Sequence, residues 1–309
     1  MHEVPIIVAG AGHLGRYHLQ KLAANEKAKL LGAVETDAAR GAEITKEFSI
    51  PCRPSIKDYE GEAVAAVVAT PTSTHKQIAI EAMSCGMDVL IEKPIAPSLE
   101  EAKAILDTAE LKGKLVQVGH TERFNPAIAA ALPISANPRY ITGERLAPFS
   151  GRSTDVDVIL DLLIHDLDIV ASLIPSEVKE VRAIGVPILT NAVDMCSARI
   201  EFENGAVAEL KAGRASLEPS RKIRLITNDR YISIDCGKKE VKAVRRLAPA
   251  EGSQWPQIQG EAIDVPDHDA LQAQDESFID CVLTRAEPIV SGRDGLRALR
   301  IAQAIKAVM

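Results

Sequence analysis

Cysteine is scarce in this 309-residue chain, and its five cysteines lie far apart with no C-x-x-C pair. An odd number of isolated cysteines argues against a disulfide framework and against a zinc knuckle, so we expect free thiols. Aromatic residues are also few, with one Trp, four Tyr and five Phe, and there is no long run of Lys or Arg. The chain therefore lacks both the basic patch and the stacking surfaces of a nucleic-acid-binding protein.

Long hydrophobic runs are missing as well, because no apolar stretch reaches the ~18 residues that a transmembrane helix needs. The segment from Met1 to Pro5 has neither the basic start nor the apolar run of a secretory signal, so we expect a cytoplasmic protein without a membrane partner. Acidic residues outnumber basic residues by 43 to 36, which gives a net charge of −7. The remaining composition, 46% hydrophobic and 26% charged, is that of a globular chain long enough for two domains.

The first 120 residues alternate short apolar runs with segments of helical period. Runs such as 65–69 are apolar at successive positions, which indicates strands buried on both faces. This pattern predicts a parallel sheet covered by helices in a first domain over residues 1–121. The predicted strands are 5–9, 29–34, 63–69, 87–92 and 114–118, and the predicted helices are 14–24, 38–48, 75–85 and 99–112.

Beyond about residue 139 the pattern changes to an alternation of apolar and polar residues, as in 198–202, 222–226 and 231–235. Alternation of this kind is typical of an antiparallel sheet with one protected face, and Asn204-Gly205 suits a tight hairpin turn. We therefore predict a second, mostly antiparallel α/β domain over residues 122–309. Its last segment, 295–308, has helical period and could pack on either domain.

The first predicted strand runs directly into a glycine-rich segment, GAGHLG at 10–15. Glycines at this spacing allow a sharp turn, close approach of backbone N–H groups to a pyrophosphate and tight packing of the next helix. Glu35 follows the second strand, 20 residues beyond Gly15, where a carboxylate accepts hydrogen bonds from a ribose and repels a 2′-phosphate. The segment predicts a dinucleotide site that prefers NAD. Asp37 competes with Glu35 for this role, and Arg40 could pair with the 2′-phosphate of NADP.

Polar residues also follow two later strands of the predicted parallel sheet. Ligands gather beyond the carboxyl ends of such strands, so the segments 70–75 and 92–94 are candidates for the same site. Pro94 restricts the backbone of Lys93 and helps to fix the direction of its side chain, although Lys93 could also be a solvated surface lysine. The predicted cofactor contacts are Gly10, Gly12, His13, Leu14, Gly15, Glu35, Thr70, Pro71, His75, Glu92 and Lys93.

Three ionisable residues, Asp161, His165 and Asp168, follow the helical spacing i, i+4, i+7 within an otherwise apolar segment. A partly enclosed histidine with carboxylates one turn away is a common arrangement for a general base. The alternative is a structural His–Asp pair. A metal site is disfavoured, since the pattern offers two ligands and the sequence shows no obvious third.

Taken in order, these motifs resemble the glucose–fructose oxidoreductase, inositol dehydrogenase and MocA family. The resemblance covers essentially the whole chain, and segments 119–126 and 155–161 resemble its bacterial branch of UDP-N-acetylglucosamine 3-dehydrogenases. The motifs that carry the resemblance are the glycine turn with His18 in the first helix, Thr70-Pro71 with His75, Glu92-Lys93-Pro94, and Asp161-x-x-x-His165-x-x-Asp168.

The resemblance implies an N-terminal Rossmann domain and a C-terminal α/β domain whose open sheet commonly forms the interface of a homodimer or homotetramer. By position, Lys93, Asp161 and His165 would be the catalytic set. We expect His165 to act as the base, Lys93 to stabilise alkoxide charge and Asp161 to bind the substrate hydroxyl and orient the pair. Lys93 and His165 could also exchange roles.

The branch implies oxidation of the 3-hydroxyl of UDP-N-acetylglucosamine to a 3-keto sugar, which a partner aminotransferase could convert to a 3-amino sugar for lipid A. A diphosphate needs cationic or backbone donors, and Arg123, Asn125 and Arg152 are the predicted substrate contacts besides Asp161 and His165. Two alternatives stay open. One is a dehydrogenase of a free sugar or polyol such as an inositol, and the other is a regulatory protein that senses NAD(H) without chemistry.

Overall fold

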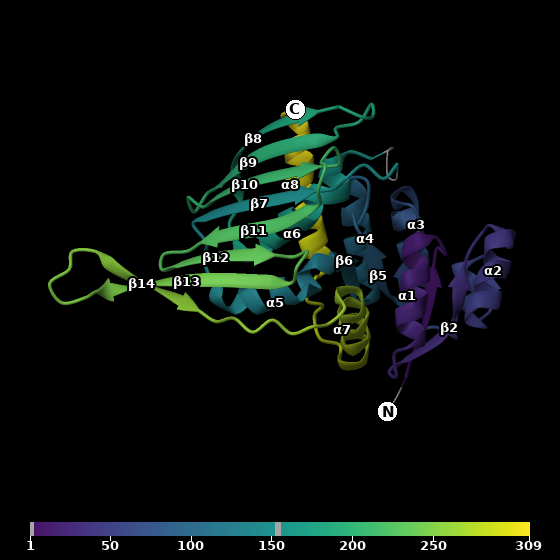
Figure 1. The fold of residues 1–309 in the computed structure, drawn as a ribbon. Coiled ribbons are helices and arrows are strands. Elements are labelled where there is room, and N and C mark those ends of the chain that lie inside the picture. Colours follow the sequence, from purple (N-terminus) through teal and green to yellow (C-terminus); the bar gives the residue numbers. More distant parts are fainter. Residues whose placement is uncertain (1–2, 152–155) are drawn as a thin grey trace. The chain divides into compact units, whose positions relative to one another are not determined.

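The computed structural model describes residues 3–151 and 156–309, which form two compact units (Figure 1). The first unit runs to Thr121 and also includes Ala270–Leu296, and the second consists of Glu122–Asp269 and Arg297–Met309. The predicted second domain, 122–309, is therefore not one continuous unit. The chain returns to the first unit through helix α7 (Ala270–Thr284), for which the sequence pattern predicted no helix.

The first unit contains a six-stranded parallel sheet in the order β3-β2-β1-β4-β5-β6. The strand order reverses between β1 and β4, so the chain leaves these two neighbours in opposite directions and opens a crevice at their carboxyl ends. The predicted doubly wound parallel sheet is confirmed. Its strands are β1 (Val4–Ala9), β2 (Ala28–Val34), β3 (Cys52–Arg53), β4 (Ala65–Val68), β5 (Asp88–Glu92) and β6 (Val116–Gly119), and its helices are α1 (His13–Ala23), α2 (Ala38–Phe48), α3 (His75–Ser84) and α4 (Leu99–Lys112).

The core of this unit explains the uninterrupted apolar runs in the sequence. Ile6 and Val8 of β1 contribute to one cluster of buried side chains that also contains Leu19 of α1 and Ile44 of α2. Phe278 of α7 belongs to the same cluster and is completely buried, which explains why this distant segment joins the first unit. Burial of an aromatic side chain stabilises such packing by a few kcal/mol, about 2 on average.

The second unit contains an eight-stranded sheet in the order β14-β13-β12-β11-β7-β10-β9-β8. Neighbouring strands are antiparallel except β7 and β10, so the prediction of a large, mostly antiparallel open sheet is also confirmed. The strands are β7 (Tyr140–Leu146), β8 (Val178–Val186), β9 (Met195–Phe202), β10 (Val207–Gly213), β11 (Ser220–Ile226), β12 (Arg230–Asp235), β13 (Glu240–Pro249) and β14 (Pro256–Glu261).

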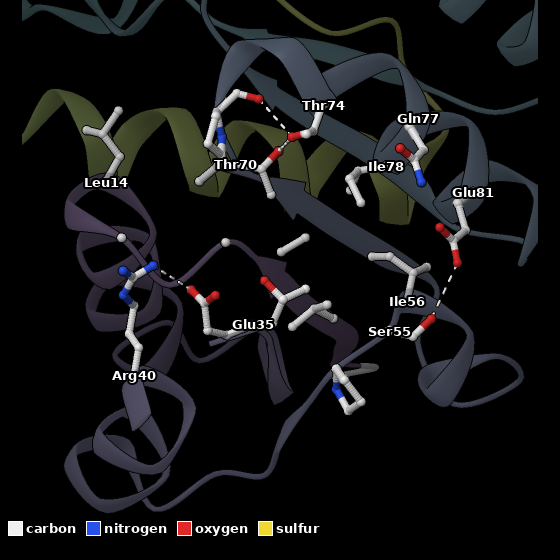
Figure 2. Close-up of a pocket in the computed structure, with 18 residues that line it drawn as sticks. Leu14, Glu35, Arg40, Ser55, Ile56, Thr70, Thr74, Gln77, Ile78 and Glu81 are labelled. Carbon is white, nitrogen blue, oxygen red and sulfur yellow. Dashed lines mark hydrogen bonds and ion pairs between the residues drawn. The ribbon is translucent and has the colours of Figure 1, made fainter. Parts of the chain in front are cut away.

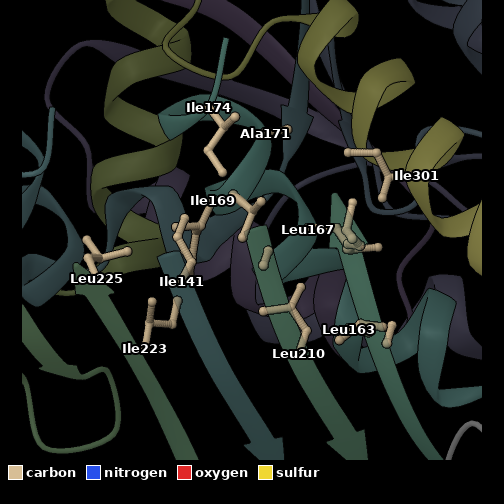
Figure 3. Close-up of a cluster of buried hydrophobic side chains, with 14 of the residues drawn as sticks. Ile141, Leu163, Leu167, Ile169, Ala171, Ile174, Leu210, Ile223, Leu225 and Ile301 are labelled. Carbon is tan, nitrogen blue, oxygen red and sulfur yellow. The ribbon is translucent and has the colours of Figure 1, made fainter. Parts of the chain in front are cut away.

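Helices cover one face of this sheet and supply the other half of its core (Figure 3). Ile223 and Leu225 of β11 pack in one cluster with Leu167 of helix α6 and Ile301 of helix α8. The alternation along the strands places Tyr231 among the exposed side chains of the opposite face, as expected for a sheet protected on one side. The helices of this unit are α5 (Pro126–Ala131), the π-helix η5 (Ile159–Leu163), α6 (Ile164–Leu173) and α8 (Gly292–Ala307), which begins in the first unit.

Within residues 3–151 and 156–309, no helix combines the length and the apolar character required to cross a membrane.

Candidate active site

Three glycines shape the turn between β1 and α1, and each meets a different steric requirement. Gly10 has a φ of +91°, and a Cβ there would lie 2.7 Å from the carbonyl oxygen of Ala69. A Cβ on Gly15 would lie 1.8 Å from the carbonyl oxygen of Gly10, so α1 can pack against the turn only with glycine. Gly12 is the N-cap of α1, and no described atom beyond its neighbours lies within 4 Å of an added Cβ. This open side, at the positive end of α1, fits a pyrophosphate.

The Glu35 carboxylate lies at the end of β2 and is held by two backbone N–H groups and one guanidinium. Figure 2 shows the contact with the guanidinium of Arg40. It accepts hydrogen bonds from the backbone N–H of Asp37 at 3.0 Å, from Arg40 at 3.1 Å and from the N–H of Ala11 at 3.3 Å. Burial alone would raise the pKa of Glu35, but the Asp37 backbone donor and Arg40 hold that pKa below its ordinary value. The carboxylate is therefore charged at neutral pH, as recognition of a ribose diol requires.

Asp37, the competing carboxylate, is the N-cap of α2. Its Oδ1 accepts hydrogen bonds from the backbone N–H groups of Ala39 at 2.9 Å and Arg40 at 3.0 Å. Capping of this kind stabilises a helix by about 1 kcal/mol and takes up Oδ1 of this carboxylate. Arg40 remains about half exposed beside Glu35, so a cation lies next to this carboxylate.

A cavity of about 780 Å³ opens beyond this edge of the sheet, a size suited to a cofactor (Figure 2). Its lining unites residues that lie far apart in the sequence, all from the first unit. The predicted contacts among the lining residues are Gly10, Gly12, Leu14, Glu35, Thr70 and Pro71. Further lining residues, which the sequence did not predict, include Ser55, the N-cap of the 3-10 turn η1 (Ile56–Tyr59), Ile56 of that turn, and Gln77, Ile78 and Glu81 of α3. With the open glycine turn and the charged Glu35, this cavity fits a nicotinamide dinucleotide.

His13 and His75, two predicted cofactor contacts, are not among the residues that line this cavity. His13 packs edge-on against Tyr17 with a ring-centroid separation of 4.9 Å, and it is not part of the cavity lining. His75 is buried, and its two ring nitrogens each lie 2.9 Å from a backbone carbonyl oxygen, those of Thr70 and Pro94. The His75 ring therefore links the loops after β4 and β5, and its contact with a cofactor stays a prediction.

Glu92 ends β5 and is buried, and it belongs to a chain of three side chains. The backbone N–H of Lys93 donates to Glu92 Oε2 at 3.3 Å, and His18 Nε2 lies 3.1 Å from Glu92 Oε1. On its other side, His18 Nδ1 lies 2.9 Å from Oδ1 of Asp275 in α7. Lys93 itself is half-buried and is followed by a cis peptide bond to Pro94. The sequence offered no signal for Asp275, which is 257 positions from His18.

The charge of His18 makes the folded state sensitive to alkaline pH. Complete burial would lower its pKa, but the carboxylates of Asp275 and Glu92 raise the pKa to about 10 from an ordinary 6.5. Since the folded-state pKa is the higher one, this stabilisation is complete below about pH 6.5 and is lost as the pH rises through 10. Urea unfolding should therefore show the stability advantage of the wild type over His18→Gln shrinking from pH 6 to pH 10. An advantage that is independent of pH would contradict a charged His18.

In the second unit, Asp161 lies in the π-helix η5 and His165 in the first turn of α6. Both side chains are half-buried. The sequence predicted one α-helix here, and the wider turn at Ile159–Leu163 is a difference that apolar spacing could not reveal. Single π-helical turns inside helices are frequent at functional sites.

Asp168 and two predicted substrate contacts serve the local fold of the second unit. Asp168 is buried, and its Oδ1 lies 3.5 Å from a guanidinium nitrogen of Arg123, whose side chain is 10% exposed. Asn125 is the N-cap of α5, accepts from the N–H of Ala127 at 3.0 Å, and donates to Glu122 at 3.2 Å and to the carbonyl of Cys236 at 3.1 Å. Asn125 therefore has no free amide for a diphosphate. Arg152, the third predicted contact, lies outside the described residues.

The structure thus gathers the predicted dinucleotide contacts in the first unit, with Lys93 on the same unit, and it places Asp161 and His165 in the second. In the described parts of the chain, no group of three or more His, Cys, Asp or Glu side chains is arranged to hold a metal ion. A parallel sheet with an open glycine turn and a carboxylate at the end of β2 is typical of dinucleotide-dependent oxidoreductases.

Comparison with known proteins agrees with this class. Residues 4–120 match the oxidoreductase family with an NAD-binding Rossmann fold, and residues 140–233 match the GFO/IDH/MocA C-terminal domain. The chain is 38% identical to UDP-N-acetylglucosamine 3-dehydrogenase of Acidithiobacillus ferrooxidans, over 98% of this chain and 96% of that protein. It is 30% identical to scyllo-inositol 2-dehydrogenase (NAD(+)) of Bacillus subtilis, over 97% and 92% of the two chains.

Solved structures give the same result. A crystal form of the Acidithiobacillus ferrooxidans enzyme superposes with a TM-score of 0.93 at 37% identity, covering 100% of this chain and 98% of that one. Scyllo-inositol dehydrogenase of Lactobacillus casei, solved with NAD(H) and scyllo-inositol, shares the fold with a TM-score of 0.82 at 20% identity and coverage of 99% and 97%. The chain belongs to the GFO/IDH/MocA family of oxidoreductases, and it is a dehydrogenase with an NAD-binding Rossmann domain.

Proposed function

We propose that the protein oxidises the 3-hydroxyl of UDP-N-acetylglucosamine to the 3-keto sugar with NAD as the hydride acceptor. The observation that carries this proposal is the 38% identity to an enzyme of that name over nearly the full length of both chains. The cavity beside Glu35 supports the cofactor half of the proposal, because its charged carboxylate suits the free ribose diol of NAD.

The catalytic roles follow from the chemistry of an alcohol oxidation. A bound nicotinamide supplies the hydride acceptor, and the chain must orient the carbinol and remove its hydroxyl proton. We assign the proton to His165 Nε2 or Nδ1, the stabilisation of developing alkoxide charge to the Lys93 ammonium, and the orientation of the hydroxyl to Asp161. Lys93 could instead take the proton, and the pH profiles of single variants distinguish the two assignments.

A 3-keto sugar carries an electrophilic carbonyl, which an amino donor can convert to a 3-amino sugar by transamination. We propose such an aminotransferase as the pathway partner, with lipid A as the end product. The second unit also leaves apolar side chains such as Tyr231 and Val244 exposed on its open sheet, and we propose that a homodimer or homotetramer covers them.

The first test is absorbance at about 340 nm, where the reduced nicotinamide of the cofactor absorbs. The purified protein is mixed with NAD or NADP, with and without UDP-N-acetylglucosamine, and an aminotransferase with its amino donor removes the keto product. We expect a signal only with NAD and the nucleotide sugar. Binding of NAD without turnover would refute this substrate.

A free polyol is the second candidate substrate, because the chain is also 30% identical to a scyllo-inositol 2-dehydrogenase. A panel of inositols and free sugars in the same assay separates the two candidates. Turnover of an inositol at a higher kcat/KM than the nucleotide sugar would replace the first proposal with the second.

Glu35 is predicted to set the preference for NAD. Glu35→Ser removes the carboxylate that repels a 2′-phosphate and leaves Arg40, 3.1 Å from that carboxylate in the wild type, free to pair with the phosphate. We expect the ratio of kcat/KM for NAD to that for NADP to fall by about 10²-fold or more, since placing two like charges side by side costs several kcal/mol and the substitution removes that cost for NADP. The matched control, Asp37→Ser, keeps a helix cap and should leave the ratio unchanged. An equal shift in both variants would contradict the role of Glu35.

A further inference from the structure

A chain of three buried ionisable side chains, Asp275, His18 and Glu92, crosses the first unit beside the glycine turn. His18 is fully buried, and its ring lies between the two carboxylates, 2.9 Å from Asp275 and 3.1 Å from Glu92. A neutral imidazole can donate one hydrogen bond only, whereas an imidazolium donates two. Two carboxylates on opposite sides of one ring therefore require the protonated form, and each of these hydrogen bonds is charge-assisted.

Each member of this chain comes from a different element. His18 lies in α1, which begins at the glycine turn, Asp275 lies in α7, and Glu92 is the last residue of β5. The Glu92 carboxylate is enclosed on a further side, since a Cβ on Gly119 at the end of β6 would lie 2.6 Å from its Oε1. The ionic hydrogen bonds therefore help to specify how these three elements pack.

At its Glu92 end, this series of hydrogen-bonded side chains contacts the backbone of Lys93. Glu92 Oε2 accepts the backbone N–H of Lys93 at 3.3 Å, while its Oε1 is held by His18. The carboxylate thus has one oxygen on the buried network and the other on the peptide that carries the lysine. Rotation of the Glu92 side chain would break both contacts together.

We propose that the buried Asp275–His18–Glu92 chain positions the Lys93 backbone, and with it the Lys93 ammonium, relative to the helix that carries the glycine turn. The inference rests on the proposed catalytic role of Lys93. It makes His18 a positioning residue that contacts neither cofactor nor substrate and acts through Glu92. A misplacement of about 1 Å at a reacting group costs about 10²-fold in rate, which sets the expected effect.

Two substitutions of His18 separate its contacts. The amide of His18→Gln can donate to Glu92 in place of Nε2, whereas the shorter amide of His18→Asn reaches the Asp275 side only. We expect His18→Asn to lower kcat by about 10²-fold with little change in the Kd for NAD, and His18→Gln to recover most of that loss. A purely structural histidine would lower thermal stability and NAD binding in both variants without this difference in kcat.

A double-mutant cycle with Lys93→Met tests whether His18 acts through the lysine. With Lys93 present, His18→Asn should cost about 10²-fold, and in the Lys93→Met background it should cost less than about 3-fold. An equal cost in both backgrounds would overturn the positioning role. If Lys93→Met alone leaves turnover unchanged, the proposed catalytic set is wrong instead.

Amide hydrogen exchange at Lys93, followed by NMR, gives a readout that needs no turnover. His18→Asn should accelerate exchange of the Lys93 amide, and His18→Gln should restore its protection, while the Val8 amide in β1 reports global stability as the control. Unchanged protection of Lys93 in His18→Asn would overturn the proposal whatever the substrate.

Discussion

Replacing His165 with asparagine should lower kcat by about 10²–10⁴-fold and leave the affinity for NAD nearly unchanged. The loss follows if His165 accepts the hydroxyl proton, because an asparagine amide does not take up a proton at neutral pH. The affinity should persist because every residue that lines the dinucleotide cavity belongs to the first unit, whereas His165 belongs to the second.

The measurement is steady-state kinetics together with calorimetric titration of NAD into wild type and variant. Thermal unfolding serves as the control for folding, since His165 is half-buried and Asn is a polar residue of smaller size. The pH profile of the residual activity then identifies the proton acceptor, because the acidic limb should disappear with His165 and stay if Lys93 is the base. Parallel losses of NAD affinity and thermal stability would instead support a structural histidine.

The parallel sheet was predictable because burial on both faces leaves a strong mark in the sequence. Strands such as β4 (Ala65–Val68) are completely buried, and their apolar runs separate cleanly from the helical periods between them. Strand β3 spans two residues, too few for any period, and α7 (Ala270–Thr284) has a weakly amphipathic sequence. The return of α7 to the first unit depends on tertiary packing of Phe278, which no local pattern encodes.

Some site residues follow from local spacing in the sequence, whereas the surroundings of others depend on long-range contacts. The glycine spacing and Glu35 lie at fixed offsets from the first two strands, so the sequence alone placed them. The surroundings of His75 and Asn125 depend on carbonyl groups 19 and 111 positions away, and their types alone did not distinguish a ligand contact from a structural one. The same limit hid Asp275, whose partner is 257 positions distant.

Substitution of Gly15 and of Gly12 by alanine should affect different properties, stability in the first case and NAD binding in the second. Gly15→Ala places a Cβ 1.8 Å from the carbonyl oxygen of Gly10, where only backbone movement can relieve the clash. We expect a loss of stability of about 3 kcal/mol, at the upper end for overpacked sites, seen as a lower midpoint in urea unfolding without any ligand.

Gly12→Ala meets no described atom beyond its neighbours within 4 Å, and Gly12 has no positive φ, so the ligand-free protein should change by less than about 1 kcal/mol. The new methyl group would instead occupy the open side of the turn, where a pyrophosphate must approach the N–H groups at the start of α1. We expect the Kd for NAD to rise on the order of 10²-fold, measured by calorimetric titration. The stabilisation that NAD gives the wild type in thermal unfolding should therefore largely vanish in Gly12→Ala. Retained NAD affinity in Gly12→Ala would place the pyrophosphate elsewhere and remove the basis for assigning the cavity to a dinucleotide.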